Sequence, residues 1–279
     1  MQENCAPRIV GETEDFAVVF KPPRMHSAPL RSEGGTLLDW YAAAFPPAAD
    51  LRGRKIGEGG LLHRLDFETS GLVLFAKNQK SLDCLLAQQA AGKFAKEYSA
   101  LCRESAHLPS SFPPPPAHLP VRELIARGGL VFVIESFFRP FGPGRKQVRP
   151  VVAAAVEAAA GKVAHDRGVC YRTEITAVSE PRLGEGDLPG CLRFAAKLTR
   201  GFRHQVRCHL AWIGFPILND PLYGEPQASA QDSDCGAESF LALFANALSF
   251  SDPSSGEPRE YRIAPQNSRE AIFNSIAQK

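Results

Sequence analysis

A short segment in the first quarter of the chain contains the residues best suited to chemistry. Between Leu61 and Leu72, a histidine and an arginine precede Asp66, and Thr69-Ser70-Gly71 follows it. A carboxylate placed between a cation and a small polar turn is a candidate reactive group. Asp, Ser and Thr also form local hydrogen bonds and favour turns. On spacing alone, Asp66 could therefore simply shape a turn.

A second segment places a lysine and a tyrosine two residues apart. Lys96 and Tyr98 lie in an alternating stretch from Phe94 to Cys102, so they would share one face of a strand. A half-buried tyrosine beside a lysine whose charged end reaches solvent would give the same pattern. The pair is therefore weak evidence of a site when taken alone.

Two basic segments could contact nucleic acid. The segment 197–210 contains lysine, arginine, histidine and one phenylalanine, but no acidic residue. The segment 139–149 holds four basic residues among glycines and prolines, again without an acid. Basic residues interleaved with aromatic ones suit phosphate contact and base stacking. A solvated basic helix and an ordinary solvated loop are the alternatives. The bases best placed to contact phosphates are Arg139, Arg145, Lys146, Arg149 and Arg203.

The sequence does not indicate a metal or a cofactor. His204 and His209 are five residues apart, not the four that put two ligands on one helix face. The seven cysteines are scattered without a Cys-x-x-Cys pair, which argues against a zinc site and a disulfide framework and favours free thiols in a reducing cytosol. Glycine-rich phosphate-binding motifs are also missing from the sequence.

The local pattern predicts the elements that position these residues. Apolar, β-branched or aromatic runs predict strands at 9–10, 16–20, 72–76, 94–102, 130–134, 169–178, 192–199 and 240–250. Helices are predicted at 36–45, 78–93, 151–161 and 204–213, the first capped by Thr36. Prolines and glycines predict loops at 109–120 and 140–150. Many strands with few, irregular helices favour a mixed α/β sheet over regular βαβ winding.

Composition limits the class of protein. Hydrophobic residues make up 44% and charged residues 22% of the chain, which is the profile of a globular protein. The net charge of +2 does not by itself indicate that the protein binds nucleic acid. No apolar run approaches the roughly 18 residues that would cross a bilayer, and no secretory signal is visible. We therefore expect a cytoplasmic monomer. The absence of a strong linker favours a single domain over 1–279, with a core of about 8–262.

Taken in order, these segments resemble the RluA-type pseudouridine synthases. The specific motifs are His63-Arg64-Leu65-Asp66 with Thr69-Ser70-Gly71, and His204-Gln205-x-Arg207-x-His209. Further matches follow in the family's order and extend over nearly the whole chain. They are Lys21-Pro22, Lys96-x-Tyr98, Gly161-Lys162-x-Ala164, Pro216-Ile217-x-x-Asp220-Pro221-Leu222-Tyr223-Gly224 and Leu243 to Phe250.

The resemblance implies both a fold and a reaction. The fold would be a large mixed, mainly antiparallel central sheet with flanking helices and loops. The reaction would isomerise specific uridines of ribosomal or transfer RNA to pseudouridine without a cofactor. The bond from N1 to the ribose breaks, the uracil rotates, and C5 joins the same sugar carbon. The implied partner is RNA, with neither DNA nor a membrane. The stretch before Lys21 is too short for the accessory RNA-binding domain of some relatives.

The resemblance also implies residue roles. Asp66 would be the catalytic carboxylate, acting as nucleophile or base, and Arg207 would be the cation paired with it. Because a stacked base cannot react, it must flip out, and Tyr98 would stack on it and move a proton. Arg64 would fill the gap left in the RNA, and Leu243 would form an apolar wall. The other expected substrate contacts are His63, Lys96, His204 and Gln205, with Arg203 and the four bases of 139–149 on phosphates.

Some positions depart from the family pattern. Arg24 occupies a position where the family usually has a glycine, and Gly201-Phe202-Arg203 occurs where the family usually has Gly-Arg-Thr. Phe244 and Asp252 replace common histidines, and Asp166 replaces a threonine. None of these is a proposed catalytic residue, so they bear on the target RNA. Two other functions are a non-catalytic RNA-binding or assembly protein on the same fold, and a metal-dependent hydrolase, which lacks a second well-spaced carboxylate.

Overall fold

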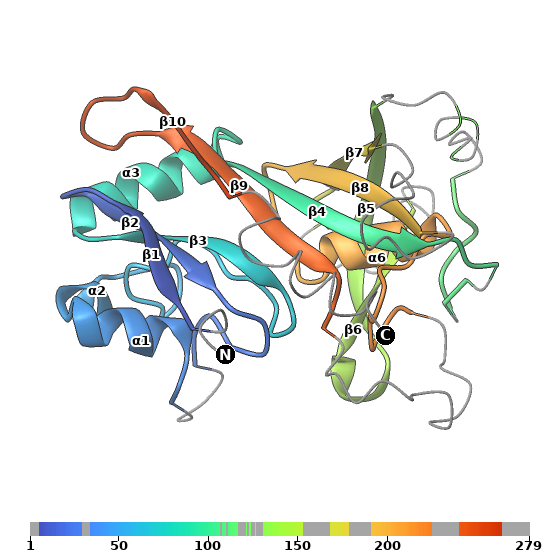
Figure 1. The fold of residues 1–279 in the computed structure, drawn as a ribbon, viewed down its shortest axis with the longest axis horizontal. Helices are drawn as coiled ribbons and strands as arrows, with labels where there is room; N and C mark the ends of the chain where they lie inside the picture. The colour runs from blue at the N-terminus through green and yellow to red at the C-terminus, as the bar shows by residue number, and fades with distance from the viewer. Residues whose placement is uncertain are drawn as a thin grey trace, which may run out of the picture. The chain divides into compact units, whose positions relative to one another are not determined.

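The fold is dominated by strands. The computed structural model describes residues 6–29, 34–106, 108–109, 111–116, 121, 123, 126, 131–152, 168–178, 191–224 and 240–263. Its strands are β1 (Arg8–Glu12), β2 (Phe16–Lys21), β3 (Ser70–Ala76), β4 (Ala95–Arg103), β5 (Val131–Phe141), β6 (Gln147–Val151), β7 (Tyr171–Val178), β8 (Cys191–Leu198), β9 (Leu243–Ser251) and β10 (Pro258–Arg262). Its helices are α1 (Leu37–Ala44), α2 (Pro47–Asp50), α3 (Gln79–Ala90), the 3₁₀ turn η2 (Pro143–Arg145) and α6 (Gln205–Trp212) (Figure 1).

The strands hydrogen-bond in the order β1-β2-β3-β9-β4-β8-β7-β5-β6, and β10 pairs with β9. The pairs β1–β2, β2–β3, β9–β10, β5–β6, β5–β7 and β7–β8 are antiparallel. β3 and β9 are parallel, with Ser70 opposite Phe244 and Gly71 opposite Ala245. The prediction of a mixed, mainly antiparallel sheet with few helices is therefore confirmed.

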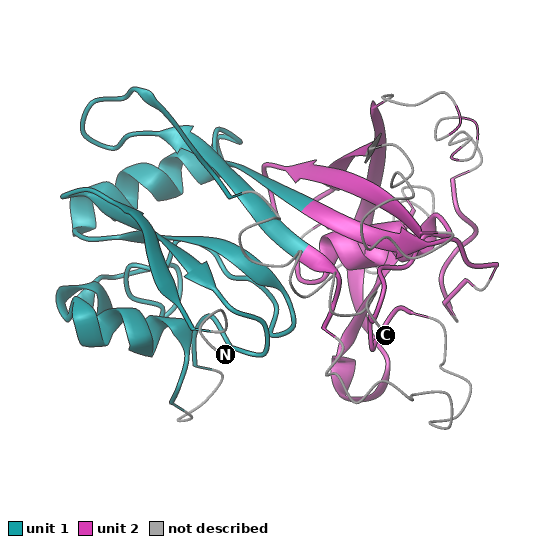
Figure 2. Cartoon of the chain, viewed as in Figure 1, with its two compact units in different colours: residues 1–98, 244–268 teal, residues 99–243, 269–279 magenta. Residues whose placement is uncertain are grey.

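The chain forms two compact units (Figure 2). Unit 1 comprises residues 1–98 and 244–268, and unit 2 comprises residues 99–243 and 269–279. The boundaries fall inside β4 and at the start of β9, so the chain changes units within strands and not through linkers. Asp66 and Tyr98 belong to unit 1, whereas Arg207 belongs to unit 2.

Unit 1 is built around two strands that are buried along their whole length, β2 and β3. Both are unbroken apolar runs, as expected for strands covered on both faces. Leu82 and Leu85 of α3 join the same core. The predicted Thr36 cap is present and forms a reciprocal capping box with Asp39 at α1. Asn78 caps α3, which had not been predicted. No helix in the described ranges has the length and apolar character needed to span a membrane.

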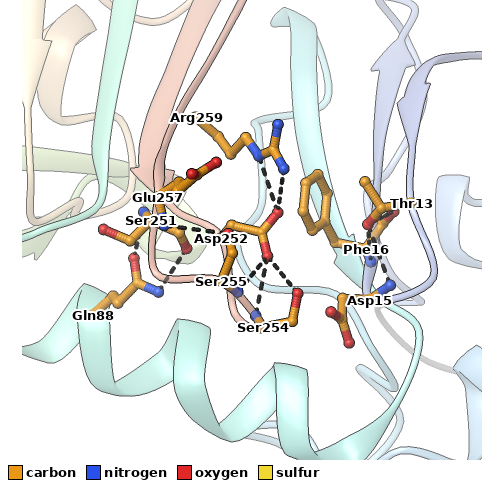
Figure 3. A network of polar contacts seen from close by, with 10 residues as sticks. All are labelled: Thr13, Asp15, Phe16, Gln88, Ser251, Asp252, Ser254, Ser255, Glu257 and Arg259. Carbon is orange, nitrogen blue, oxygen red and sulfur yellow. Dashed lines mark hydrogen bonds and ion pairs between the residues drawn. The ribbon is translucent and has the colours of Figure 1, made fainter.

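The hairpin of β9 and β10 was not expected from the sequence. Figure 3 shows the polar network at its turn, where the buried Asp252 carboxylate accepts hydrogen bonds from Ser254, Ser255 and Arg259. The bonds from Ser254, helped by those from Ser255 and Arg259, lower the pKa of Asp252 to about 2. Asp252, which replaces a common family histidine, therefore forms the turn of this hairpin.

Unit 2 corrects one predicted loop. The predicted loop 140–150 is mostly strand, because β5 continues to Phe141 and β6 begins at Gln147. Only residues 142–146 form the turn between these two strands. Arg139 of β5 lies opposite Arg149 of β6. Val151, the predicted start of a helix, ends β6. The remainder of that helix, 153–161, and the Gly161 to Ala164 motif lie outside the described residues, as do 117–120 of the predicted proline-rich loop.

Candidate active site

The backbone around Asp66 is held on both sides by buried side chains of another segment. The Ser27 hydroxyl accepts from the N–H of Leu65 and donates to its carbonyl, both at 3.0 Å. The ammonium of Lys21 donates to the carbonyl of Phe67 at 3.4 Å. The N–H of Thr69 bonds the carbonyl of Asp66 itself at 3.1 Å. These contacts fix the residue before Asp66 and the residue after it, while Asp66 remains partly exposed.

Lys21 also shapes the segment that supplies Ser27. Its fully buried ammonium donates to the carbonyls of Pro22 at 2.9 Å and Met25 at 2.8 Å. Between them, Arg24 takes a left-handed conformation with φ of 58°, where glycine is the usual residue. Arg24, which stands where the family usually has a glycine, thus has a backbone conformation that favours glycine.

His63 lies just before the Asp66 segment, at the end of the hydrogen bonding that joins Leu62 and His63 to Leu74 of β3. Leu62 donates to the carbonyl of Leu74 at 3.0 Å, and the N–H of Leu74 then donates to His63 Nε2 at 3.2 Å. A ring nitrogen that accepts from a backbone N–H carries no proton, so the proton of the neutral ring is on Nδ1. Burial, with the nearby Lys96 charge, lowers the pKa of His63 well below its usual value. Within its unit, His63 thus positions the chain before Asp66.

Gly71 is required where β3 meets β9. Its φ is +131°, and a Cβ there would lie 2.2 Å from the carbonyl oxygen of Ala245. The close backbone approach explains the glycine of Thr69-Ser70-Gly71. The hydroxyls of Thr69 and Ser70 are buried and have no hydrogen-bond partner among the described residues.

Tyr98 lies within electrostatic range of Asp66. Its side chain is buried, and burial together with the charge of Asp66 raises the pKa of the phenol above its usual value of 10. The hydroxyl is therefore protonated at neutral pH and can donate a hydrogen bond or a proton. Asp66 and Tyr98 thus lie in the same unit within electrostatic range of each other, and their catalytic roles stay predictions.

Two further predicted residues differ in their surroundings. Arg64 is exposed and forms an ion pair with Glu58 at 3.4 Å. Lys96 is buried, and burial with the neighbouring charge of Arg54 lowers the pKa of its ammonium to about 8. Lys96 and Tyr98 share the buried face of β4, as their spacing predicts.

In unit 2, Arg207 is fully buried and bonded to Asp220. Its Nε and one terminal nitrogen each donate to a different carboxylate oxygen at 2.8 Å. Asp220 also accepts from the N–H groups of Leu222 at 2.9 Å and Tyr223 at 3.1 Å. A buried charge must be compensated in this way. The expected pairing of Arg207 with Asp66 joins residues of different units and stays a prediction.

The other motif residues of α6 have internal partners. Nε2 of Gln205 donates to the carbonyl of Arg172 and to Thr173 Oγ1, and its Oε1 accepts from Phe202. His209 lies between Ser136 and Thr173 at 2.9 and 2.8 Å. His204 precedes the helix with φ of 57°, and its Nδ1 is 3.1 Å from the Tyr223 hydroxyl. Gln205 and His209 therefore join α6 to the sheet, and RNA contact by His204 and Gln205 stays a prediction.

The predicted phosphate-contacting bases gather at the β5–β6 hairpin. Arg139 and Arg149 are opposite each other, so their side chains project from the same face. Arg145 and Lys146 are exposed at the turn. Arg203, which precedes α6 and does not belong to it, donates to the carbonyls of Arg145 at 2.6 Å and Gln147 at 3.0 Å. The loop before α6 is thus tied to the basic hairpin. Leu243, at the start of β9, is buried.

Comparison with known proteins identifies the family. The model of the family described as RNA pseudouridylate synthase matches residues 15–212. The chain belongs to the RNA pseudouridylate synthase family. The resemblance drawn from the motifs is therefore confirmed, including its RluA-type branch.

Relatives of the synthase family support this placement. The chain is 29% identical over 261 residues to "Ribosomal large subunit pseudouridine synthase D" of Pseudomonas aeruginosa, covering 89% of this chain and 65% of that protein. It is 25% identical to "Uncharacterized RNA pseudouridine synthase YlyB" of Bacillus subtilis, covering 94% and 71%. The chain thus spans slightly less than two thirds of the length of the Pseudomonas protein.

Two solved structures share the synthase fold. "Human RNA Pseudouridylate Synthase Domain Containing 1" has a TM-score of 0.59 and 20% identity, over 95% of this chain and 86% of that one. "Human RNA Pseudouridylate Synthase Domain Containing 4" has a TM-score of 0.57 and 17% identity, over 97% and 94%.

Sequence reasoning overlooked three residues that support this synthase site. Ser27 gave no signal, since a serine in a proline-rich turn is ordinary. Lys21 was noted only as part of Lys21-Pro22, without a role. Asp220 lay in a matched motif. The signal that could have identified it is Arg207 in the preceding helix, because a buried arginine needs a nearby acid as its partner. In the described ranges, no group of three or more His, Cys, Asp or Glu could hold a metal ion.

Proposed function

We propose that this chain is an RNA pseudouridine synthase that isomerises uridines of ribosomal or transfer RNA. The observation that supports it best is the buried phenol of Tyr98, which lies within range of the charge of Asp66 inside unit 1. A carboxylate acceptor and a phenol donor in one place are the two groups that the isomerisation requires. Family membership and the names of the relatives point the same way.

The chemistry follows from these two side chains. The Asp66 carboxylate attacks the sugar or removes a sugar proton, and the N1–ribose bond breaks. The freed uracil rotates on the ring of Tyr98, and C5 joins the same sugar carbon. The proton on C5 is then lost and N1 gains one, so the reaction is redox-neutral and needs no cofactor. A phenol that stays protonated at neutral pH suits stacking and proton donation at this step.

RNA would be held through its phosphates by the basic hairpin. Arg139 and Arg149 face the same side, and like charges directly opposite each other in a ladder destabilise it. A polyanion that lies across the hairpin would relieve that repulsion. Because phosphate contacts position RNA without reading sequence, the choice of uridine would depend on RNA shape and on unstacked bases.

The test is pseudouridine formation by purified protein in total cellular RNA, followed by site mapping. The wild type should create pseudouridine at discrete sites. Asp66→Asn keeps the side-chain shape but removes the charge, so it should bind RNA and form none. Asp50→Asn, an exposed carboxylate elsewhere in unit 1, is the matched control and should be fully active. Substantial turnover by Asp66→Asn at saturating enzyme would refute the catalytic role of Asp66.

A further inference from the structure

The Lys96 side chain is mostly buried, and its charge has no compensating partner among the described residues. The residue is only 6% exposed, and it lies on the inner face of β4. In the part of the chain that the structure describes, no carboxylate and no carbonyl accepts a hydrogen bond from it. Lysine is almost never buried without a partner, because desolvating its charge is strongly unfavourable.

The groups beside Lys96 are cationic or neutral, not anionic. Arg54 is close enough for its charge to act on Lys96, and the neighbouring His63 ring is neutral. Among the described residues, Arg54 itself forms no ion pair, whereas Arg64 is balanced by Glu58. Lys96 and Arg54 thus lie within electrostatic range of each other, and no carboxylate among the described residues pairs with either of them.

The loop that carries Arg54 is fixed in place. The side-chain amide of Gln79 in α3 accepts from the N–H of Arg52 at 2.9 Å and donates to its carbonyl at 3.4 Å. At the next residue, a Cβ on Gly53 would lie 2.8 Å from the carbonyl oxygen of Gly59. The backbone of this loop is therefore held at Arg52, two residues before Arg54, and it has little free space at Gly53.

We propose that Lys96, together with Arg54, forms a phosphate-binding subsite for the backbone of the target uridine. The missing counter-charge at this site is then supplied by the RNA. This inference rests on the proposed function, because it takes the base stacked on Tyr98 to be the uridine that reacts.

The geometry favours a phosphate of that nucleotide. Lys96 and Tyr98 are two residues apart on one strand face, which places them about 7 Å from each other, a span comparable with one nucleotide. An ammonium has three donors and no acceptor, and it binds phosphate as a point charge. Arg54 is exposed, and its charge acts on Lys96, so it would add a second cation to the same anion.

The first test separates a binding role from a structural one. Lys96→Met removes the charge and keeps an unbranched apolar chain, so its melting temperature should equal or exceed that of the wild type. The probe is an oligocytidylate containing one uridine. Its affinity should fall about tenfold, and the log–log salt slope should flatten by about 0.7, the value for one lost contact on a single strand. Lys93→Met, an exposed lysine just before β4, should change neither.

The second test locates the phosphate. A neutral methylphosphonate on either side of the uridine should weaken binding to the wild type about tenfold at one of the two positions. The same substitution should have little effect on Lys96→Met, and Lys96→Arg should restore most of the affinity.

Several results would overturn the subsite. These are a less stable or unfolded Lys96→Met, unchanged affinity with a lower saturating rate, and equal methylphosphonate effects in the wild type and Lys96→Met. None of them bears on the proposed function, which is judged by pseudouridine formation in the Asp66→Asn comparison.

Discussion

Tyr98 keeps its proton because both its burial and the charge of Asp66 oppose ionisation. Tyr98 can therefore supply a proton donor within electrostatic range of the Asp66 carboxylate. At this scale the sequence was informative about the family, since the Asp66 motif is specific, whereas Lys96-x-Tyr98 gained weight only from its place in the ordered set of motifs. The supporting Ser27 could not be foreseen, because its role depends on which distant backbone it reaches.

Tyr98→Phe should test the phenol separately from the ring. The ring keeps its stacking surface, so RNA affinity should stay within about twofold, because base–aromatic stacking needs only the π-face. The single-turnover rate at saturation should fall by about 10²-fold or more, the range for loss of a proton-transfer group. Tyr98→Ala should lose both affinity and rate. A near-wild-type rate for Tyr98→Phe would leave stacking as its only role.

Elements differed in how well the sequence predicted them. The buried strand β3 and the helices α1 and α3 were predicted because apolar spacing and, at α1, the Thr36 cap are local signals. The hairpin β5–β6 was missed because Pro140 and Pro150 suggested a loop. Pairing of β5 with β7 stops at Ser136, and β6 is an edge strand, so neither proline removes a needed hydrogen bond. The strand β10 was missed because its charged residues alternate on an exposed edge.

Ser27→Ala should show how closely the Asp66 segment is positioned. It leaves the N–H and the carbonyl of Leu65 without their partner, which should lower the free energy of unfolding by about 1–3 kcal/mol. The single-turnover rate should fall more than RNA affinity does, because the loop and not the RNA contact is loosened. Ser70→Ala is the matched control. Its buried hydroxyl has no partner among the described residues, so chemical denaturation should show no loss of stability. Equal effects of the two variants would contradict this positioning role.

His209 should make the helix α6 sensitive to acid. Burial lowers its pKa to about 3, whereas the unfolded chain takes up a proton near pH 6.5. The unfolded state therefore binds more protons between these values, and stability decreases as pH falls from about 6.5 towards about 3. The slope attributable to this residue should be roughly 1 kcal/mol per pH unit. Denaturation of the wild type and His209→Gln across this range measures it, and parallel curves would count against the assignment.

At the scale of the whole molecule, arginine side chains have two different roles that the net charge does not reveal. The chain is almost neutral overall, yet Arg139 and Arg149 lie side by side on one hairpin, while Arg207 is buried against Asp220. The two arginines of the hairpin should govern RNA affinity. The buried Arg207 should govern the stability of the fold and, by the sequence prediction, the ionisation of Asp66.

A salt series should separate the two kinds of arginine. Arg139→Ala or Arg149→Ala should flatten the log–log salt dependence of RNA binding by about 0.7 to 0.9 and leave the saturating rate nearly unchanged. Arg207→Ala should collapse the rate with a modest change in slope. It should also lower the free energy of unfolding by about 3–5 kcal/mol, because Asp220 loses its cation. If Arg207→Ala lost affinity at an unchanged rate, the predicted pairing with Asp66 would have to be abandoned.

The parallel contact between β3 and β9 has a consequence for biosynthesis. Gly71 packs closely against the backbone of Ala245, and most of unit 2 lies between these two residues in the sequence. During synthesis, the ribosome releases the Asp66 segment long before the strand that supports it. Contacts of such long sequence separation form late. A nascent or truncated chain without β9 would therefore hold Asp66, the proposed catalytic carboxylate, on an incomplete framework, and the proposed RNA modification would have to wait until translation has passed that strand.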